Sequence, residues 1–284
     1  MTRHQANSTS RPGDVLTERT PRVAAARQLT RRQGRDRAGR FLAEGAQAVR
    51  EALSWAGEGR GQVHELFVTE VAAGRNADLL HAADAAGIRI SEITERAAEG
   101  LSETVTPQGV IAVCDRVEVT MAEALHGSPR LVAVLVGIAD PGNAGTVVRV
   151  ADAAGADAVI FAGDTVDVHN GKCVRASTGS VFHLPIARSR DTASVLQACA
   201  EADLRLVAAD GNTEADLDTA DDRGELAAPT AWLFGSEAHG VPQDVLAAAD
   251  IALKVPIHGA AESLNLATAA AVCLYASARA QRRG

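Results

Sequence analysis

The sequence predicts an α/β protein with a C-terminal parallel-sheet domain that follows a smaller α/β domain. Short apolar runs alternate with Ala-rich helical stretches along most of the 284 residues, which is the pattern of a parallel sheet covered by helices on both faces. The run at 131–136 is continuously apolar, as in a central strand that is buried on both sides. The polar stretch 115–129 ends in Gly-Ser-Pro and is expected to link the two domains.

Composition predicts a cytoplasmic protein with no membrane span. Apolar residues make up 46% of the chain and charged residues 23%, which is typical of a globular protein. No apolar stretch approaches the roughly 18 residues that cross a bilayer, and the first residues lack the apolar core of a signal peptide. The four cysteines lie too far apart for a C-x-x-C site, so we expect buried thiols in a reducing compartment and no metal.

Charge is divided unevenly along the chain. Residues 1–40 hold ten arginines against three acidic residues, a net charge of +7, whereas the remaining 244 residues hold 18 basic and 33 acidic side chains. A basic arm on an acidic body is typical of a protein that binds nucleic acid. Residues 1–18 mix Ser, Thr, Pro and Gly with charge, and we expect them to form a disordered basic tail.

The N-terminal domain is expected to span residues 19–114. Thr20-Pro21 marks the start of its first helix, with Pro in the first turn. The later elements expected here are a helix at 41–56, strands at 65–68, 88–90 and 110–113, and helices at 77–86 and 95–102.

The C-terminal domain is expected to span residues 130–284. In a parallel sheet the carboxyl ends of the strands share one edge, and open α/β sheets bind ligands at that edge. The elements expected after the first strand are strands at 158–162, about 181–186, 204–208, 231–234 and 251–255, and helices at 144–154, 192–202 and 264–282.

Three polar segments with glycines, at 140–149, 234–242 and 255–265, lie beside strands of this sheet. In the first, Asn143 and Arg149 fit either an anion site at a helix start or a helix cap with a surface arginine. In the second, Glu237 lies between two glycines, which fits either a close backbone approach to a ligand or an ordinary turn.

The third segment and a fourth one also allow two interpretations each. Ser263 is a plausible N-cap, a role compatible with a functional one, whereas Asn265 is expected inside the helix and is not explained by capping. Lys172 and Arg175 belong to a segment over 172–180 that either contacts phosphate or a cofactor, or forms a basic surface turn. Four of the eight histidines, at 169, 183, 239 and 258, lack metal-ligand spacing and are expected at the surface or in a pocket. No G-x-G-x-x-G, Walker A, H-E-x-x-H or G-x-S-x-G motif supports another enzyme class.

Taken together, the order and spacing of the three segments resemble the motifs of the SpoU (TrmH-like) RNA ribose 2′-O-methyltransferases of the SPOUT superfamily. The matching features are Asn143 and Arg149 six residues apart, Gly235 with Glu237, and Ser263-Leu264-Asn265 after Val255-Pro256. The first half is similar to the ribosomal-protein-L30e-like domain of some family members, through residues 40–45 and 106–110.

The resemblance implies a C-terminal trefoil knot, a homodimer, and S-adenosyl-L-methionine as the methyl donor bound in the knot. It also implies RNA as the partner, and the added N-terminal domain favours 23S ribosomal RNA; a tRNA target and a non-catalytic RNA-binding protein of the same fold remain alternatives. The residues that it assigns to the reaction are Asn143, Arg149, Glu237, Ser263 and Asn265; to the cofactor, Leu233, Gly235, Gly240, Val255, Ile257, Ser263 and Leu264; and to RNA, Arg27, Arg31, Arg32, Arg35, Arg37 and Arg175.

The implied chemistry needs alignment and the removal of one proton. A sulfonium methyl group is already activated, so the enzyme aligns a ribose 2′-hydroxyl with it and takes the proton away. In the family, the arginine that matches Arg149 is proposed as the base. Because a guanidinium stays protonated in proteins, the alternative is that Arg149 instead holds the adjacent phosphate and lowers the pKa of the hydroxyl.

Overall fold

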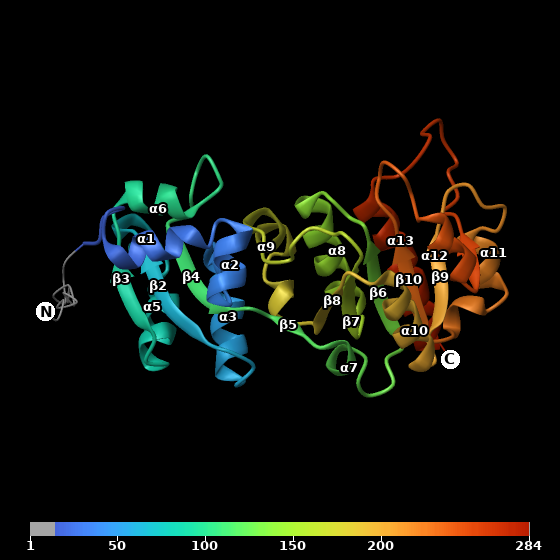
Figure 1. The fold of residues 1–284 in the computed structure, drawn as a ribbon, viewed down its shortest axis with the longest axis horizontal. Coiled ribbons are helices and arrows are strands. Elements are labelled where there is room, and N and C mark those ends of the chain that lie inside the picture. The colour runs from blue at the N-terminus through green and yellow to red at the C-terminus, as the bar shows by residue number, and fades with distance from the viewer. Residues whose placement is uncertain (1–14, 284) are drawn as a thin grey trace, which may run out of the picture.

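Two β-sheets lie one after the other along the long axis of the molecule (Figure 1). The computed structural model describes residues 15–283, so most of the expected tail, residues 1–14, lies outside the described residues. The tail was expected to reach residue 18, but Leu16 is already buried and pairs with Ile93 in a β-bridge. This apolar contact holds residues 15–18 on the first sheet.

The N-terminal sheet has four strands in the order β1-β4-β2-β3. Strand β4 is antiparallel to β1 and β2, whereas β2 and β3 are parallel. The strands are β1 (Arg40–Glu44), β2 (Val63–Val68), β3 (Arg89–Glu92) and β4 (Val110–Asp115), and the helices are α1 (Pro21–Gln28), α2 (Arg32–Ala38), α3 (Ala46–Gly57), α4 (Glu70–Arg75), α5 (Ala77–Ala85) and α6 (Glu95–Leu101).

The expected helix at 41–56 is wrong in its first residues. Residues 41–44 belong to strand β1, where Phe41 and Ala43 are fully buried and pair with β4. Gly45 then adopts a φ of 100°, a conformation that favours glycine, and α3 begins only at Ala46. The glycine therefore separates a strand from a helix where the apolar spacing alone predicts one continuous helix.

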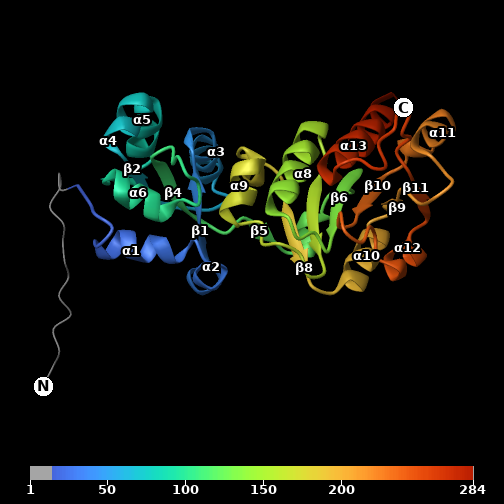
Figure 2. The same ribbon diagram turned by 90° about the horizontal axis from the view of Figure 1, so that it is seen from above.

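The C-terminal sheet has seven parallel strands in the order β11-β9-β10-β6-β7-β8-β5. Helices α8 and α13 cover one face of it and α10 and α12 the other (Figure 2). The strands are β5 (Glu118–Val119), β6 (Leu131–Val136), β7 (Ala158–Ala162), β8 (Ile186–Ser189), β9 (Arg205–Ala209), β10 (Thr230–Phe234) and β11 (Ile251–Leu253), and the helices are α7 (Met121–Ala124), α8 (Pro141–Ala154), α9 (Gly171–Ser177), α10 (Thr192–Glu201), α11 (Leu217–Asp222), α12 (Gln243–Ala248) and α13 (Leu266–Arg283).

Three expectations for this half differ from the structure. The strand expected near 181–186 is replaced by a 3-10 turn at Ser180–Phe182, and β8 begins only at Ile186, which pairs with Val159 of β7. The expected linker carries β5, which extends the sheet beside β8, and the short helix α7. Most of the segment over 172–180 lies in the helix α9, which begins at Gly171 and ends at Ser177.

The core of the C-terminal half is mainly aliphatic, with one buried polar contact between sheet and helix. Trp232 of β10 is fully buried, and its Nε1 donates to the buried Oγ of Ser277 on α13 at 2.9 Å. All four cysteines are buried and free, as expected, and burial raises the pKa of Cys199 and Cys273 to about 12. No helix among residues 15–283 is both long and apolar enough to cross a membrane.

A buried ion pair joins the two halves. Arg35 of α2 is 3% exposed, and its Nε and Nη2 reach Asp167 Oδ2 at 2.8 and 2.7 Å. Its Nη1 donates to two backbone carbonyls just after α1, both at 3.0 Å. Asp167 Oδ1 accepts the backbone N–H of His169 at 2.9 Å, and the ring Nε2 of His169 accepts the N–H of Val117 at 3.1 Å. Burial alone would raise the pKa of Asp167, but its bonds to His169 and the charge of Arg35 hold that pKa well below its ordinary value.

A second contact across the junction centres on His183. Its Nδ1 lies 2.7 Å from a carboxylate oxygen of Asp152 on α8, and its Nε2 lies 3.0 Å from one of Glu51 on α3. Partial burial disfavours the charged ring, but the hydrogen bonds to the two carboxylates outweigh it and raise the pKa of His183 above 6.5. The charged ring can donate to both carboxylates at once.

We expect Arg35→Met to lower the free energy of unfolding by about 3–5 kcal/mol, because it leaves the buried Asp167 carboxylate without its counter-charge. Urea unfolding followed by circular dichroism measures the loss. The matched control is Arg37→Met on the exposed side of the same helix, for which we expect a change within about 0.5 kcal/mol. Similar stability of the two variants would contradict the prediction.

The His183 contact makes stability depend on pH in the neutral range. Because its pKa is raised in the folded state, its contribution is full below about pH 6.5 and is lost as the pH rises through the raised value. We therefore expect the urea midpoint of the wild type to fall as the pH rises through the pKa of His183. In the His183→Gln variant this pH-dependent decrease in the midpoint should be absent. His81→Gln, at an exposed position on α5, is the control and should leave the profile unchanged.

Candidate functional site

An open pocket lies at the carboxyl ends of β9, β10 and β11. Its volume is about 580 Å³, within the range of small-molecule sites. Three loops form it, one after each of these strands, and the last of them leads into α13. The lining residues are Ala209, Asp210, Gly211, Phe234, Gly235, Ser236, Glu237, Gly240, Leu253, Lys254, Val255, Ile257, Glu262, Ser263, Leu264, Asn265, Leu266 and Ala269.

Three of the predicted reacting residues meet beside this pocket. The side-chain amide of Asn143, in the first turn of α8, donates to Glu237 Oε1, and its Oδ1 accepts from Asn265 Nδ2 at 3.1 Å. Asn265 was expected inside the last helix, but it precedes α13, and its Oδ1 accepts the N–H of Ala267 at 2.9 Å. Asn265 therefore caps α13 and contacts Asn143 at the same time.

The other two predicted reacting residues have different surroundings. Ser263 lines the pocket. Arg149 lies on the exposed side of α8, where its Nη1 donates to Thr178 Oγ1 at 3.3 Å, and no hydrogen bond joins it to the three residues above. Among residues 15–283 no carboxylate lies within ion-pair distance of Arg149, so its charge is available to a ligand.

The start of α8 is fixed by a capping carboxylate. Asp140 Oδ1 accepts the backbone N–H of Asn143 at 2.8 Å, and its Oδ2 accepts from Lys172 Nζ at 2.7 Å. Although slight burial opposes them, the hydrogen bonds from Lys172 and Asn143 lower the pKa of Asp140. Its charge also suits the positive end of the helix dipole.

Six of the seven residues predicted for the cofactor line the pocket, and Leu233 does not. Leu233 is fully buried in the core on the α10 and α12 face of the sheet, whereas its neighbour Phe234 lines the pocket. Sequence reasoning also missed Asp210 and Glu262. The other segments were found because polar residues follow a predicted strand. The same rule would have found Asp210, which follows the predicted strand 204–208.

Gly235 allows a close approach of two backbone segments within the pocket wall. A Cβ at this position would lie 2.0 Å from the carbonyl oxygen of Gly240. Ser236 and Gly240 pair in a β-bridge, in which the N–H of Gly240 donates to the carbonyl of Ser236 at 2.8 Å. Glycine at 235 is therefore required by the shape of the loop.

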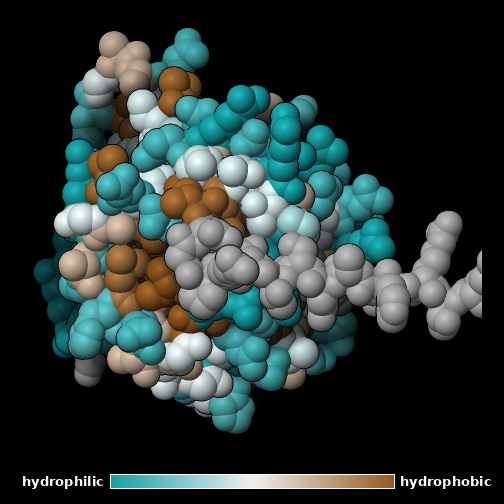
Figure 3. All heavy atoms as spheres, turned by 90° about the vertical axis from the view of Figure 1, so that its left-hand side faces the viewer, coloured by the Kyte–Doolittle hydropathy of each residue, from teal (hydrophilic) through white to brown (hydrophobic). Residues whose placement is uncertain are grey.

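The six arginines predicted for RNA divide into two groups. Arg35 is buried in the ion pair with Asp167, and Arg175 is paired with Glu44 and Glu103 at 3.2 and 4.0 Å, so neither is a free cation. The other four are exposed on α1, on α2 and between them: Arg27, Arg31, Arg32 and Arg37. The end of the molecule formed by the N-terminal domain is hydrophilic over most of its rim, with several hydrophobic groups at and to the left of its centre (Figure 3).

One group of side chains among residues 15–283 has the spacing of a metal site, namely Glu118, Asp167 and His169. Arg35 pairs with Asp167 and Arg116 with Glu118, so the carboxylate charges are already matched by arginines. His169 is buried, and its Nε2 already accepts a backbone N–H. This donor set fits an ion-pair cluster between the two halves better than a metal centre.

Comparison with known proteins identifies a family of related sequences for each half of the chain. The sequence profile of the SpoU rRNA Methylase family matches residues 130–275, and that of the MRM3-like substrate binding domain matches residues 20–112. The chain is 32% identical over 261 residues to the 23S rRNA (guanosine(2553)-2'-O)-methyltransferase RlmP of Bacillus subtilis, over 92% of this chain and 97% of that protein.

Solved structures of RNA methyltransferases are similar to this chain over almost its whole length. A crystal structure of an RNA 2'-O ribose methyltransferase matches with a TM-score of 0.80 and 33% identity, over 95% of this chain and 100% of that one. The AdoMet-bound rRNA methyltransferase from Sinorhizobium meliloti matches with a TM-score of 0.78 and 29% identity, over 92% of this chain and 95% of that one.

We expect Gly235→Ala to open the loop between β10 and α12, because the new Cβ cannot lie 2.0 Å from the Gly240 carbonyl oxygen. Hydrogen exchange at the Gly240 amide should accelerate about fivefold or more, since a net hydrogen bond contributes about 1 kcal/mol. Gly211→Ala is the matched control, because Gly211 lines the same pocket and its Cβ would meet nothing within 4 Å. Equal protection in both variants would refute the prediction.

Proposed function

The chain belongs to the SpoU rRNA Methylase family, and we propose that it transfers the methyl group of S-adenosylmethionine to a ribose 2′-hydroxyl of 23S ribosomal RNA. The observation that carries the proposal is the meeting of three distant segments at one sheet edge. Asn143, Glu237 and Asn265 join beside a pocket of cofactor size. The similar proteins named above act on 23S rRNA or are solved with AdoMet, which supports both the substrate and the donor.

The pocket residues fit the proposed cofactor. Val255, Ile257 and Leu264 offer apolar surface for the adenosine part, and the close-packed loop at Gly235 offers backbone groups. Asp210 and Glu262 line the same pocket with carboxylates, which suit hydroxyl and ammonium groups. S-adenosylmethionine supplies an activated methyl group on a sulfonium centre.

The chain's own residues then align the ribose and hold the adjacent phosphate. We propose that Asn143, Glu237 and Asn265 position the ribose through their amide and carboxylate groups, with Ser263 on the pocket side. Arg149 is exposed and has no carboxylate partner among residues 15–283, so its guanidinium is suited to the phosphate next to the reacting ribose. Held there, its positive charge lowers the pKa of the 2′-hydroxyl and favours loss of its proton to solvent as the methyl group is transferred.

RNA recognition is assigned to the exposed arginines of the first domain. Arg27, Arg31 and Arg37 have no ion-pair partner among residues 15–283, and Arg32 faces Asp36 at a distance of 3.9 Å. Charges of this kind on short helices suit contacts to the phosphates of a folded RNA better than reading of its bases.

We also propose a homodimer, a trefoil knot and a cytoplasmic location. Helix α13 exposes two large hydrophobic side chains, Val272 and Tyr275, which supports a dimer face. The backbone of Lys254 pairs with Ala215 and Leu217 before the chain returns to pack α13 on α8, a path that supports the knot. A 23S rRNA substrate supports the cytoplasm, and we propose that the reaction uses no bound metal.

We expect Arg149→Lys to bind S-adenosylmethionine normally and to lose about 100-fold in turnover, because lysine cannot reproduce the two-pronged contact of a guanidinium. Transfer of tritiated methyl groups to 23S rRNA measures turnover, and mapping of 2′-O-methyl positions identifies the product. Calorimetry measures cofactor binding. Near-normal methylation by this variant would remove Arg149 from the reaction, and no transfer by the wild type would refute the proposed function.

Replacing Arg27, Arg31, Arg32 and Arg37 together by glutamine is expected to weaken RNA binding and to flatten its dependence on salt. Each phosphate contact contributes about 0.7–0.9 to the slope of log K against log salt, so the slope should fall by up to about 3. The control replaces four other exposed arginines by glutamine, namely Arg75, Arg89, Arg96 and Arg223. An equal loss in both variants would show that net charge, and not this surface, binds the RNA.

A further inference from the structure

Helix α9 touches both the reacting residues and the N-terminal domain. Near its start, Lys172 Nζ donates to Asp140 Oδ2 at 2.7 Å, and Asp140 holds the backbone of Asn143. Directly after the helix, Thr178 Oγ1 accepts from Arg149 Nη1 at 3.3 Å. The two ends of this short helix therefore hold the two α8 residues that we assign to the ribose and its phosphate.

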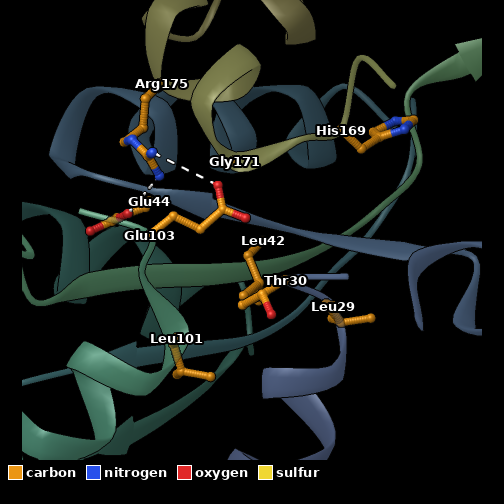
Figure 4. Close-up of a pocket in the computed structure, with 9 residues that line it drawn as sticks. All are labelled: Leu29, Thr30, Leu42, Glu44, Leu101, Glu103, His169, Gly171 and Arg175. Carbon is orange, nitrogen blue, oxygen red and sulfur yellow. Dashed lines mark hydrogen bonds and ion pairs between the residues drawn. The ribbon is translucent and has the colours of Figure 1, made fainter. Parts of the chain in front are cut away.

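The middle of α9 is tied to the N-terminal domain. Arg175 reaches from the helix toward Glu44 of β1 and Glu103, as Figure 4 shows. The Glu44 carboxylate is buried, and both of its oxygens also accept from Ser102 Oγ at 2.8 Å. The cavity beside these residues measures only about 20 Å³, so the two parts are joined here by direct contact.

Close packing and a strained residue hold α9 in place. A Cβ on Gly145 of α8 would lie 2.2 Å from the carbonyl oxygen of Cys173, so the two helices are in backbone contact there. Thr178 has a φ of 53°, an outlier for a β-branched residue. Strain of this kind persists where the surroundings enforce it, and it collects at functional sites.

We propose, on the basis of the proposed function, that α9 sets the geometry of methyl transfer. Lys172 and Thr178 are positioning residues for Asn143 and Arg149, and Arg175 ties this arrangement to the domain that binds RNA. Binding of RNA to the N-terminal domain and alignment of the ribose are then linked through one helix.

The first test uses Lys172→Met, at a side chain that is 54% exposed in its ion pair. We expect the rate at saturating RNA and cofactor to fall about tenfold or more, because small misplacements of reacting groups are costly, with the KM for RNA unchanged. Lys172→Arg should restore the rate. Arg50→Met is the matched control, since it breaks another exposed ion pair of 2.7 Å, with Asp78, far from the site.

Two results would overturn the role of Lys172. A raised KM with an unchanged maximal rate would make Lys172 a direct phosphate contact, and an unchanged rate would make the ion pair incidental. The side-chain amide signal of Asn143 gives a readout that does not need activity, and it should shift in Lys172→Met but not in Arg50→Met. If that shift is seen but the wild type transfers no methyl group, the proposed function is refuted, whereas the structural coupling of Lys172 to Asn143 stands.

The second test uses Thr178→Gly, which removes both the hydroxyl and the strained conformation. Glycine adopts this backbone conformation freely, so we expect a thermal midpoint no lower than that of the wild type together with a slower maximal rate. Thr178→Ser keeps the hydroxyl and should keep most of the rate. A Thr178→Gly variant as fast as the wild type would remove Thr178 from the positioning role.

The tie to the N-terminal domain is tested by Arg175→Lys, which keeps a charge beside the buried Glu44 but cannot reach Glu44 and Glu103 together. We expect the double variant, Arg175→Lys with Lys172→Met, to lose less rate than the product of the two single losses, because both changes act through α9. Losses that multiply independently would refute the link between the two domains.

Discussion

The arrangement of the two halves depends on two opposite charges that are both buried. A guanidinium or carboxylate alone in an apolar interior is costly, and each becomes tolerable here only through the other. Arg35 is placed by α2 and Asp167 by the loop after β7, so the pair forms only when these elements meet. His169 and the N–H of Val117 complete the network, which also fixes the segment between the domains.

The C-terminal sheet was predictable because parallel strands are buried on both faces. Runs such as 131–136 and 158–162 have no polar residue to place on a solvent face, so their type and extent follow from the sequence. The start of the 41–56 segment was not predictable in the same way. Apolar spacing there fits a helix, and only the pairing of β1 with β4, far along the chain, favours a strand.

The residues that meet at the edge of the sheet could be predicted from the sequence, because sheet geometry brings them together. The role of a residue that pairs with a distant part of the chain could not. The segments at Asn143, Glu237 and Asn265 converge because each borders the same sheet edge. Arg35 and Asp167 are 132 residues apart, and nothing local distinguishes Arg35 from the exposed arginines beside it. Leu233 and Phe234 differ only in the face of the sheet on which each side chain lies.

The buried arginine also determines how this enzyme can be recombined with its relatives. The last part of the basic arm is not a detachable extension, because α2, which carries the exposed Arg32 and Arg37, also carries Arg35 of the ion pair between the domains. A chimera that takes its first domain from another family member would bring a partner for Asp167 only if that domain carries an equivalent arginine. Exchange of the first domain between such proteins thus requires that the charged contacts across the junction remain matched, above all the buried pair of Arg35 and Asp167.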